Sequence, residues 1–179
     1  MKLIILTGMP GSGKSEVADA FQNAGFPIIV MGDVIRKEVE RRGMDVNPKN
    51  NKLVMLELRE RDGPGAVAKH CLDSLRNSNS KVVVIEGCRS LAEVDVFDGY
   101  AEEVFIVCVH ASPRTRFSRL QKRGRKDDPH DWTTFRERDL REISVGLGAV
   151  IALSDIVVVN EETLEDLRNE SNNLVQRLT

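Results

Sequence analysis

The sequence predicts an α/β protein with a parallel sheet and helices on both faces of the sheet. Short apolar runs of strand length alternate with longer stretches of helical periodicity along most of the 179 residues. Strands that alternate with helices in this way form a doubly wound parallel sheet. A glycine-rich segment directly follows the first apolar run, at the edge where such sheets bind ligands. The chain length indicates a single domain, residues 1–179.

The glycine-rich segment follows an apolar strand over residues 2–7. Its residues are Gly8, Met9, Pro10, Gly11, Ser12, Gly13, Lys14 and Ser15. They match the pattern G-x-x-x-x-G-K-[S/T] at every defined position. Val17, Phe21 and Ala24 then recur at helical spacing, and Gly25 stands where a helix C-cap belongs. Strand, loop and helix are the context that a phosphate loop requires, which argues against an accidental glycine-rich turn.

A loop of this kind binds the phosphates of a nucleoside triphosphate. Glycines let the backbone turn its N–H groups inward, and the helix N-terminus adds positive partial charge. Lys14 can then reach the β and γ phosphates, while the Ser15 hydroxyl ligates Mg²⁺. The sequence therefore predicts ATP and Mg²⁺ as cofactors, with GTP left open as an alternative donor.

The second apolar run, residues 27–31, predicts another strand. Gly32 and Asp33 then open a helix that Gly43 closes. Further helical stretches are expected over residues 51–61 and from the next glycine break to residue 76. Two or three helices between neighbouring strands make a long crossover. We interpret residues 32–78 as an inserted helical cap that covers an acceptor molecule.

The second half of the chain predicts the remaining strands. Apolar runs over residues 81–85, 104–109 and 155–159 have the length and composition of buried strands. Ser112 and Pro113 are suited to the N-cap and the first position of a helix. The last helix places its leucines on one face, namely Leu164, Leu167, Leu174 and Leu178.

Composition excludes several classes of protein. Hydrophobic residues make up 41% and charged residues 30%, as in soluble globular proteins. The net charge of −2 provides no general field for nucleic acid or membranes. We expect a cytoplasmic protein, because the sequence shows neither a signal peptide nor an apolar run near the ~20 residues of a membrane span. Cys71, Cys88 and Cys108 lack the spacing of a disulfide framework or a zinc site.

Polar side chains follow the predicted strands at the edge that carries the phosphate loop. Asp33 and Arg36 come after the second strand, and Glu86 and Arg89 come after the third. Arginine binds phosphate through two parallel hydrogen bonds, so Arg36 and Arg89 are candidates for a clamp on a second phosphorylated molecule. Glu86 stands where a Walker B acid would hold Mg²⁺ through water. A surface salt-bridge set among these four residues is the alternative.

Residues 113–141 form the most basic part of the chain. They contain ten basic and five acidic residues, a net charge of +5 in a protein of −2. The polar centre carries Gly124 and Pro129, which predicts a mobile lid, residues 123–135, between two helices. One arginine that a lid places on a transferring phosphoryl group is worth about 10³ to 10⁵ in rate. A solvated helix or an RNA-binding patch are alternatives, but few aromatic residues lie nearby, so nucleic acid is not expected.

Motifs spread over the whole chain occur together. They are the phosphate loop, Gly32-Asp33-x-x-Arg36, Glu86-Gly87-x-Arg89, Arg119-x-x-x-Arg123, Gly124-Arg125-x-Asp127-Asp128 and Arg136. With these motifs the chain resembles the nucleoside monophosphate kinases of the adenylate and uridylate kinase type. It is similar, more closely still, to an archaeal family of phosphate-loop proteins related to adenylate kinase. The resemblance implies a P-loop fold with strand order 2-3-1-4-5.

The resemblance also implies an activity and roles for residues. The protein would transfer the γ phosphoryl group of ATP to a small-molecule acceptor, a nucleoside monophosphate, with AMP as the first candidate. Arg36 and Arg89 would bind the acceptor phosphate, with Asp33 beside them, and Arg119 would lie against the donor base. Transition-state charge would be stabilised by Lys14, Arg123, Arg125 and Arg136. Ser15 and Glu86 would organise the metal.

Three departures from the adenylate kinase pattern leave the acceptor base open. The third-strand motif is usually Asp-Gly-Phe-Pro-Arg and here is Glu-Gly-Cys-Arg-Ser, so Arg89 stands one position earlier. The lid is short, and the residues of the cap that would recognise a base cannot be matched to that family.

Two other functions remain as alternatives. The stretch Asp33-Val34-Ile35-Arg36 is similar to the Asp-x-Ile-x-Arg element of dephospho-coenzyme A kinase. A hydroxyl acceptor benefits from a carboxylate base, so Asp33 would then act as a general base. The non-enzyme alternative is a nucleotide-binding switch or assembly factor with slow ATP hydrolysis.

Overall fold

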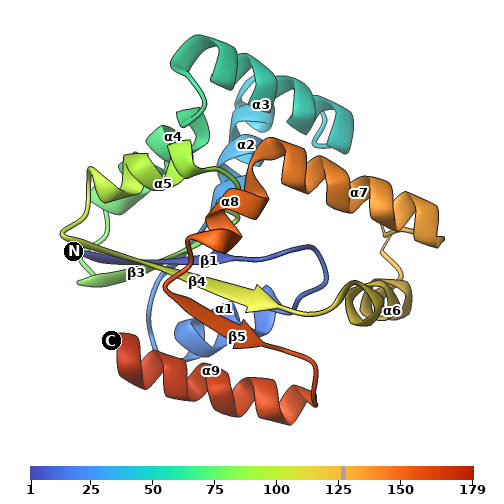
Figure 1. Cartoon of the computed structure of the whole chain (residues 1–179). Helices are drawn as coiled ribbons and strands as arrows, with labels where there is room; N and C mark the ends of the chain where they lie inside the picture. Colours follow the sequence, from blue (N-terminus) through green and yellow to red (C-terminus); the bar gives the residue numbers. More distant parts are fainter. Residues whose placement is uncertain (126–127) are drawn as a thin grey trace.

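The computed structural model describes residues 1–125 and 128–179 (Figure 1). The strands are β1 (Lys2–Thr7), β2 (Ile28–Val30), β3 (Val82–Glu86), β4 (Glu103–His110) and β5 (Ile156–Val159). The helices are α1 (Lys14–Asn23), α2 (Met31–Arg41), α3 (Pro48–Asp62), α4 (Ala66–Arg76), α5 (Leu91–Asp98), α6 (Pro113–Arg123), α7 (Trp132–Val145), α8 (Leu147–Ala152) and α9 (Leu164–Leu178).

The strands within these described residues form one parallel five-stranded sheet in the order β2-β3-β1-β4-β5. The predicted fold class and strand order are therefore confirmed. β1 lies at the centre, with Leu6 opposite Glu86 of β3 and Thr7 opposite Cys108 of β4. This register brings the carboxyl ends of the central strands to the same edge of the sheet.

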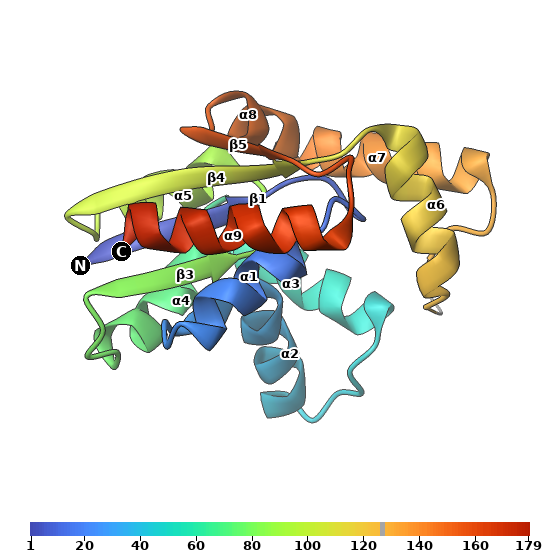
Figure 2. The ribbon, with the colours of Figure 1, turned by 90° about the horizontal axis from the view of Figure 1, so that it is seen from below.

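β1 is buried on both faces. Leu3 and Ile5 pack with residues of α2, α3, α4, α5 and α8, whereas Ile4 and Leu6 pack with α1 and α9. Successive side chains of a strand point to opposite faces, so a central strand between two helical layers needs apolar residues at both. Figures 1 and 2 show α1 and α9 on one face and α4, α5 and α8 on the other.

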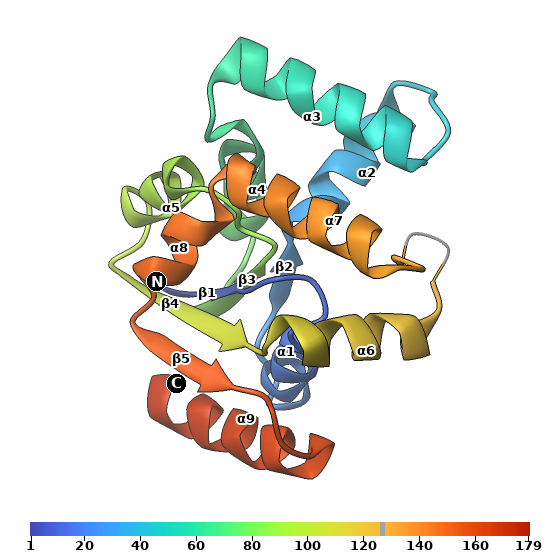
Figure 3. The same ribbon diagram turned by 45° about the vertical axis from the view of Figure 1, so that its right-hand side comes forward.

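Helices also extend beyond the carboxyl ends of the strands. α2, α3 and α4 occupy the crossover between β2 and β3, as the long predicted crossover required. α6 and α7 run antiparallel, since Arg116 contacts Asp139 and Gln121 contacts His130. Figures 1 and 3 show α7 between α6 and α3. None of the helices in the described parts of the chain is long and apolar enough to cross a membrane.

Two short helices escaped the sequence analysis, α5 and α8. They have 8 and 6 residues, too few for a repeated apolar spacing to stand out. The segment predicted as a lid, residues 123–135, is divided between the end of α6, a connection and the first turn of α7. Lys126 and Asp127 of that segment lie outside the described residues.

The first prediction concerns Gly65, which precedes α4 and touches α5. A Cβ atom there would lie 2.7 Å from the Ala92 carbonyl oxygen and 2.8 Å from Val96 Cγ2. The φ angle of Gly65 is −87°, which alanine adopts without backbone strain. The effect of the substitution is therefore purely steric. We expect Gly65→Ala to lower the free energy of unfolding by about 1–3 kcal/mol, because α4 must move away from α5. Urea denaturation measures this change.

The matched control is Gly148→Ala inside α8. A Cβ atom at Gly148 would make only an ordinary contact of 3.8 Å with Ile143 Cγ2. Alanine is the better helix former, so this variant should be neutral or more stable by up to about 1 kcal/mol. Equal losses of stability in both variants would contradict the steric explanation.

Candidate functional site

The phosphate loop, residues 8–15, lies directly on the end of β4 and on Asn160, which follows β5. Gly8 and Gly13 have φ angles of +140° and +104°, which residues other than glycine rarely adopt. A Cβ atom at Gly8 would lie 2.3 Å from the Val109 carbonyl oxygen, and one at Gly13 would lie 2.3 Å from Asn160 Nδ2. Both positions therefore require glycine for conformation and for space.

The N-terminus of α1 is suited to an anion. Gly13 is its N-cap, and no side chain caps the helix. Across residues 1–125 and 128–179, no acceptor is found for the backbone N–H of Gly11 or of Gly13. The hydroxyls of Ser12, in the loop, and of Thr7, directly before it, are buried and find no hydrogen-bond partner among the described residues. Unsatisfied donors and a positive helix end fit the phosphates of a nucleotide.

Lys14 points its amine back along the loop. Its Nζ lies 2.7 Å from the Gly8 carbonyl oxygen and 3.2 Å from that of Met9. Loss of water around the amine lowers the pKa of Lys14 from 10.5 to about 8, although Glu86 acts in the opposite direction. Arg89 lowers this pKa further and Glu142 raises it. Glu86 and Arg89 thus lie close enough to Lys14 to act on its charge, as the strand-end argument predicted.

Arg89 is held by acids of two helices. Its backbone N–H donates to Glu93 of α5 at 2.8 Å, and its Nε lies 3.5 Å from Glu142 of α7. The Arg89 side chain remains half exposed, whereas that of Glu93 is 2% exposed. Glu93 also accepts a hydrogen bond from Arg59 Nη2 of α3 at 3.1 Å. One buried carboxylate therefore joins α3 to the backbone at Arg89.

Asp33 and Arg36 form an ion pair with each other on α2. Both side chains are about half exposed, at 49% and 46%. α2 begins beside the end of β3, where Met31 Cβ would lie 3.7 Å from a Cβ atom on Gly87. No ion pair in the described parts of the chain joins Asp33 or Arg36 to Arg89, so the four residues do not form one salt-bridge set.

Arg116 of α6 is buried against the phosphate loop. Its two Nη atoms bind the Asp139 carboxylate of α7 at 2.8 and 2.7 Å, and its Nε donates to the Ala111 carbonyl oxygen at 3.1 Å. Nη1 also donates to the Pro10 carbonyl oxygen at 3.2 Å. The guanidinium lies 5.0 Å from the centre of the Phe135 ring. This arginine of the basic segment is neutralised inside the protein.

Arg119 lies one turn further along α6, beside the segment that follows β5. Its Nη1 and Nη2 donate to the carbonyl oxygen and Oδ1 of Asn160 at 3.0 and 3.1 Å. Asn160 is 5% exposed, and its Nδ2 donates to the Ser12 carbonyl oxygen at 2.8 Å. Arg119 is thereby linked to the phosphate loop through a single side chain.

Asp128 organises the connection between α6 and α7. Arg123 binds its carboxylate through two hydrogen bonds, and Arg138 lies 3.6 Å away. Arg123, followed by the backbone N–H of Arg125, holds the pKa of Asp128 below its usual range. Arg123 and Arg138 are thus paired, while the side chains of Arg125 and Arg136 are exposed.

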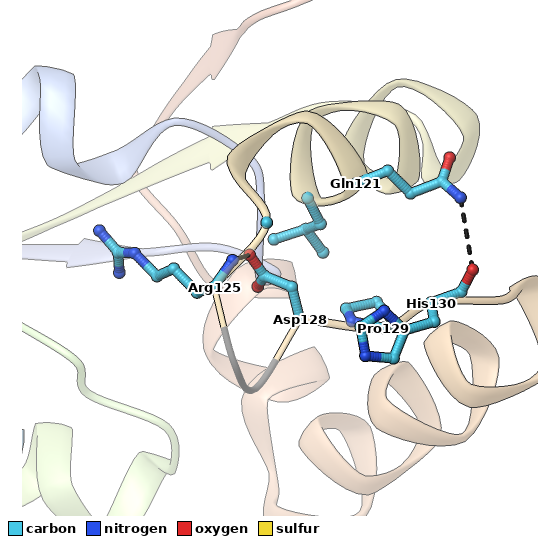
Figure 4. A pocket seen from close by; sticks show the side chains of 7 residues that line it. Gln121, Arg125, Asp128, Pro129 and His130 are labelled. Carbon is cyan, nitrogen blue, oxygen red and sulfur yellow. Dashed lines mark hydrogen bonds between the residues drawn. The ribbon is translucent and has the colours of Figure 1, made fainter.

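A small pocket lies between the end of α6 and this connection (Figure 4). Its volume is about 150 Å³, and Gln121 Nε2 donates to the His130 carbonyl oxygen at 3.5 Å beside it. The Arg125 side chain points away from it in Figure 4. Ligand sites usually measure about 300–1,000 Å³, so this pocket is too small for a nucleotide.

The whole chain is similar to archaeal proteins of one family. It is 47% identical over 178 residues to the UPF0200 protein of Hyperthermus butylicus, covering 99% of this chain and 95% of that one. It is 43% identical to the UPF0200 protein of Pyrococcus abyssi, covering 98% and 96% of the two chains. The chain belongs to the UPF0200 family. A family model described as an AAA domain also matches residues 4–143, so this UPF0200 protein contains a nucleotide-binding phosphate-loop domain.

Solved structures show the same fold for the UPF0200 chain. TT1252 from Thermus thermophilus superposes with a TM-score of 0.65 at 19% identity, covering 99% of this chain and 97% of that one. A gluconokinase from Sinorhizobium meliloti has a TM-score of 0.57 at 16% identity, covering 99% and 93%. The chain therefore shares the fold of these proteins, and the relation to adenylate kinase stays a prediction from the motifs.

Sequence reasoning did not find Asn160, Glu142 or Arg116. Asn160 directly follows β5, so the argument that selected residues after the second and third strands would also have selected this one. Glu142 and Arg116 lie inside helices, and only the packing of α6 and α7 brings them to the site.

The lowered pKa of Lys14 predicts a dependence of stability on pH. The unfolded chain holds the Lys14 proton up to about pH 10.5, whereas the folded protein loses it near pH 8. Stability rises with pH wherever the unfolded state binds more protons. The destabilising contribution of this charge is thus fully present below pH 8 and is relieved between pH 8 and 10.5.

We expect the wild type to gain stability relative to Lys14→Met across this interval, by on the order of 2 kcal/mol. Urea denaturation of both proteins without nucleotide, at pH 7, 8, 9 and 10, measures the difference. All other titrating groups are common to the two chains and cancel. A constant difference from pH 7 to pH 10 would show that the amine is not desolvated.

Proposed function

We propose that this UPF0200 protein is an ATP- and Mg²⁺-dependent kinase that transfers the γ phosphoryl group to a nucleoside monophosphate, with AMP as the first acceptor to test. One observation carries the proposal. Glu86 ends β3 opposite Leu6 of β1, at the edge of the sheet that carries the phosphate loop, and both Glu86 and Arg89 act on the pKa of Lys14. A cation for the donor phosphates, a carboxylate for the metal and an arginine for the acceptor are what phosphoryl transfer requires.

The donor side is supported by the loop and by Arg119. The free N–H groups of Gly11 and Gly13, with Lys14, are suited to the donor phosphates. Asn160 accepts hydrogen bonds from both Nη atoms of Arg119, and these in-plane bonds orient the guanidinium so that a purine can stack on its planar face. We assign Arg119 to the donor base on this ground.

Ser15 and Glu86 are the residues that would hold Mg²⁺, which neutralises phosphate charge when bound. Magnesium usually takes one or two protein oxygens and completes its shell with phosphate and water. Ser15 in the first turn of α1 and Glu86 at the end of β3 would provide one hydroxyl and one carboxylate oxygen, which fits that pattern.

The acceptor side is supported by the orientation of Arg89. Glu142 faces its Nε and Glu93 holds its backbone, so the Nη atoms are left for an acceptor phosphate. Arg36 is paired with the exposed Asp33, and an exposed pair of this kind contributes about 0–1 kcal/mol. Arg36 can therefore release the Asp33 carboxylate and bind a phosphate at little cost in free energy. We propose that residues 32–78, which include Arg36, form the cap over the acceptor.

The chemical step needs positioning and positive charge rather than covalent catalysis. We assign this role to Lys14 and to the arginines Arg123, Arg125 and Arg136, with residues 123–135 as a lid that excludes water. Arg125 and Arg136 are exposed on that part of the chain. Arg123 would exchange the Asp128 carboxylate for the phosphoryl group.

A kinase that acts on a hydroxyl group is the second candidate. The likeness to a gluconokinase favours it, because that acceptor is not a phosphate. The Asp33 carboxylate would then serve as the general base, and its exposed position on α2 leaves it accessible to an acceptor.

Phosphoryl transfer from labelled ATP tests the proposal. The purified full chain with Mg²⁺ is offered AMP, CMP, UMP, GMP, dephospho-coenzyme A, gluconate and water in turn. We expect a labelled nucleoside diphosphate, and we expect Lys14→Ala to reduce its formation by at least about 100-fold, because the transition state loses its central cation. Circular dichroism verifies that this variant is folded.

The other possible products of this assay would indicate a different function. Transfer to dephospho-coenzyme A or gluconate would establish the hydroxyl kinase, and release of phosphate alone would favour a nucleotide-dependent switch. Full activity of folded Lys14→Ala would refute the placement of the donor phosphates.

Arg36→Ala tests the acceptor clamp. We expect the KM for the acceptor to rise by about tenfold or more, since a charge-assisted hydrogen bond contributes about 1.5–3 kcal/mol, while the KM for ATP changes little. Steady-state kinetics with each substrate varied in turn measure both constants. Arg41→Ala is the matched control, because Arg41 makes the same type of pair with Glu38 on the same helix. Equal effects of Arg36→Ala on both substrates would refute the clamp.

A further inference from the structure

Two side chains bind carbonyl oxygens of the phosphate loop from outside the loop. Arg116 Nη1 donates to the Pro10 oxygen at 3.2 Å, and Asn160 Nδ2 donates to the Ser12 oxygen at 2.8 Å. In a trans peptide group, the C=O and the following N–H point in opposite directions. The peptide groups here are trans. Holding these two oxygens from outside therefore turns the N–H groups of Gly11 and Gly13 toward the inner side of the loop.

The orientation of the Asn160 amide is determined by its partners. Its Oδ1 accepts from Arg119 Nη2 at 3.1 Å, and its backbone N–H donates to the His110 carbonyl oxygen at 2.7 Å. Turning the amide over would set Nδ2 against the arginine and Oδ1 against the Ser12 oxygen, which replaces two hydrogen bonds with two repulsions. The group that faces the loop is thus a donor.

The orientation of Arg116 is determined in the same way. Asp139 binds both of its Nη atoms, and the Ala111 carbonyl oxygen binds Nε. Both charged side chains are 4% exposed. Turning the guanidinium away would leave the buried carboxylate of Asp139 and the arginine itself as unpaired charges, which is strongly unfavourable. The remaining contact with Pro10 is therefore fixed by α7.

We infer that Arg116 and Asn160 are positioning residues that pre-organise the phosphate loop for its anion. They direct the Gly11 and Gly13 amides before a ligand arrives, so the ligand meets donors that need no reorientation. Both depend on α6, which carries Arg116 and holds Asn160 through Arg119. The inference rests on the proposed function only in requiring that polyphosphate binds the loop.

Neutral variants of the full chain separate orientation from charge. Asn160→Leu removes the donor to Ser12 with little change in volume. The double variant Arg116→Met with Asp139→Leu removes the donor to Pro10 and both buried charges, a replacement that folded proteins often tolerate. Asn172→Leu is the matched control, because Asn172 is exposed on α9.

The probe is inorganic tripolyphosphate with Mg²⁺, which has no base and leaves the stacking face of Arg119 unused. Calorimetry should give a dissociation constant about tenfold higher in each of the two test variants, which corresponds to about 1.4 kcal/mol. The control should match the wild type. Thermal denaturation verifies that every variant is folded at the assay temperature.

NMR chemical shifts of the backbone amides supply a second readout, which would not change if Arg116 and Asn160 had a purely structural role. Tripolyphosphate should shift the Gly11 and Gly13 N–H resonances of the wild type, and the shift of Gly13 should be smaller in Asn160→Leu even at saturation. Unchanged affinity and unchanged glycine shifts in the folded variants would overturn the inference. A wild type that binds neither tripolyphosphate nor ATP would instead overturn the proposed function, and the inference with it.

Discussion

The close contact between the phosphate loop and the ends of β4 and β5 determines where the groups of the site can lie. A methyl group in place of a Cα hydrogen would overlap the Val109 carbonyl oxygen at Gly8 and the Asn160 amide at Gly13. The loop therefore lies flat against the sheet edge and α1 starts there. Lys14, in the first turn, is placed beside Glu86 and Arg89 as a result.

The sequence was sufficient for the features that depend on neighbouring residues and on parallel strands. The motif placed the loop, and the rule that strand ends share an edge placed Glu86 and Arg89 near Lys14. It was insufficient where distant helices meet. Glu142 reaches Arg89 only because α7 packs over the strand ends. The short helices α5 and α8 lacked the length for a periodic signal, and their positions follow from packing on the sheet.

The net charge of residues 113–141 also overstated how much positive charge this segment presents to a ligand. Arg116 binds Asp139 in the interior, and Arg123 and Arg138 gather around Asp128. Arg116 has a structural role, because a buried guanidinium with a bidentate partner has little freedom to turn. Exposed arginines such as Arg125 and Arg136 are the ones that present charge to a ligand. Net charge per segment cannot distinguish the two groups, since only the fold determines which acids are near.

The buried carboxylate of Glu93 has a mechanical consequence for the acceptor side. It is bonded to Arg59 of α3 and to the backbone of Arg89, so the two cannot separate without leaving a buried acceptor unsatisfied. A displacement of α3 is thereby transmitted to the turn after β3. The orientation of α3 and the conformation of the turn that carries Arg89 would then change together. A molecule that fixed the backbone at Arg89 would therefore favour one orientation of α3.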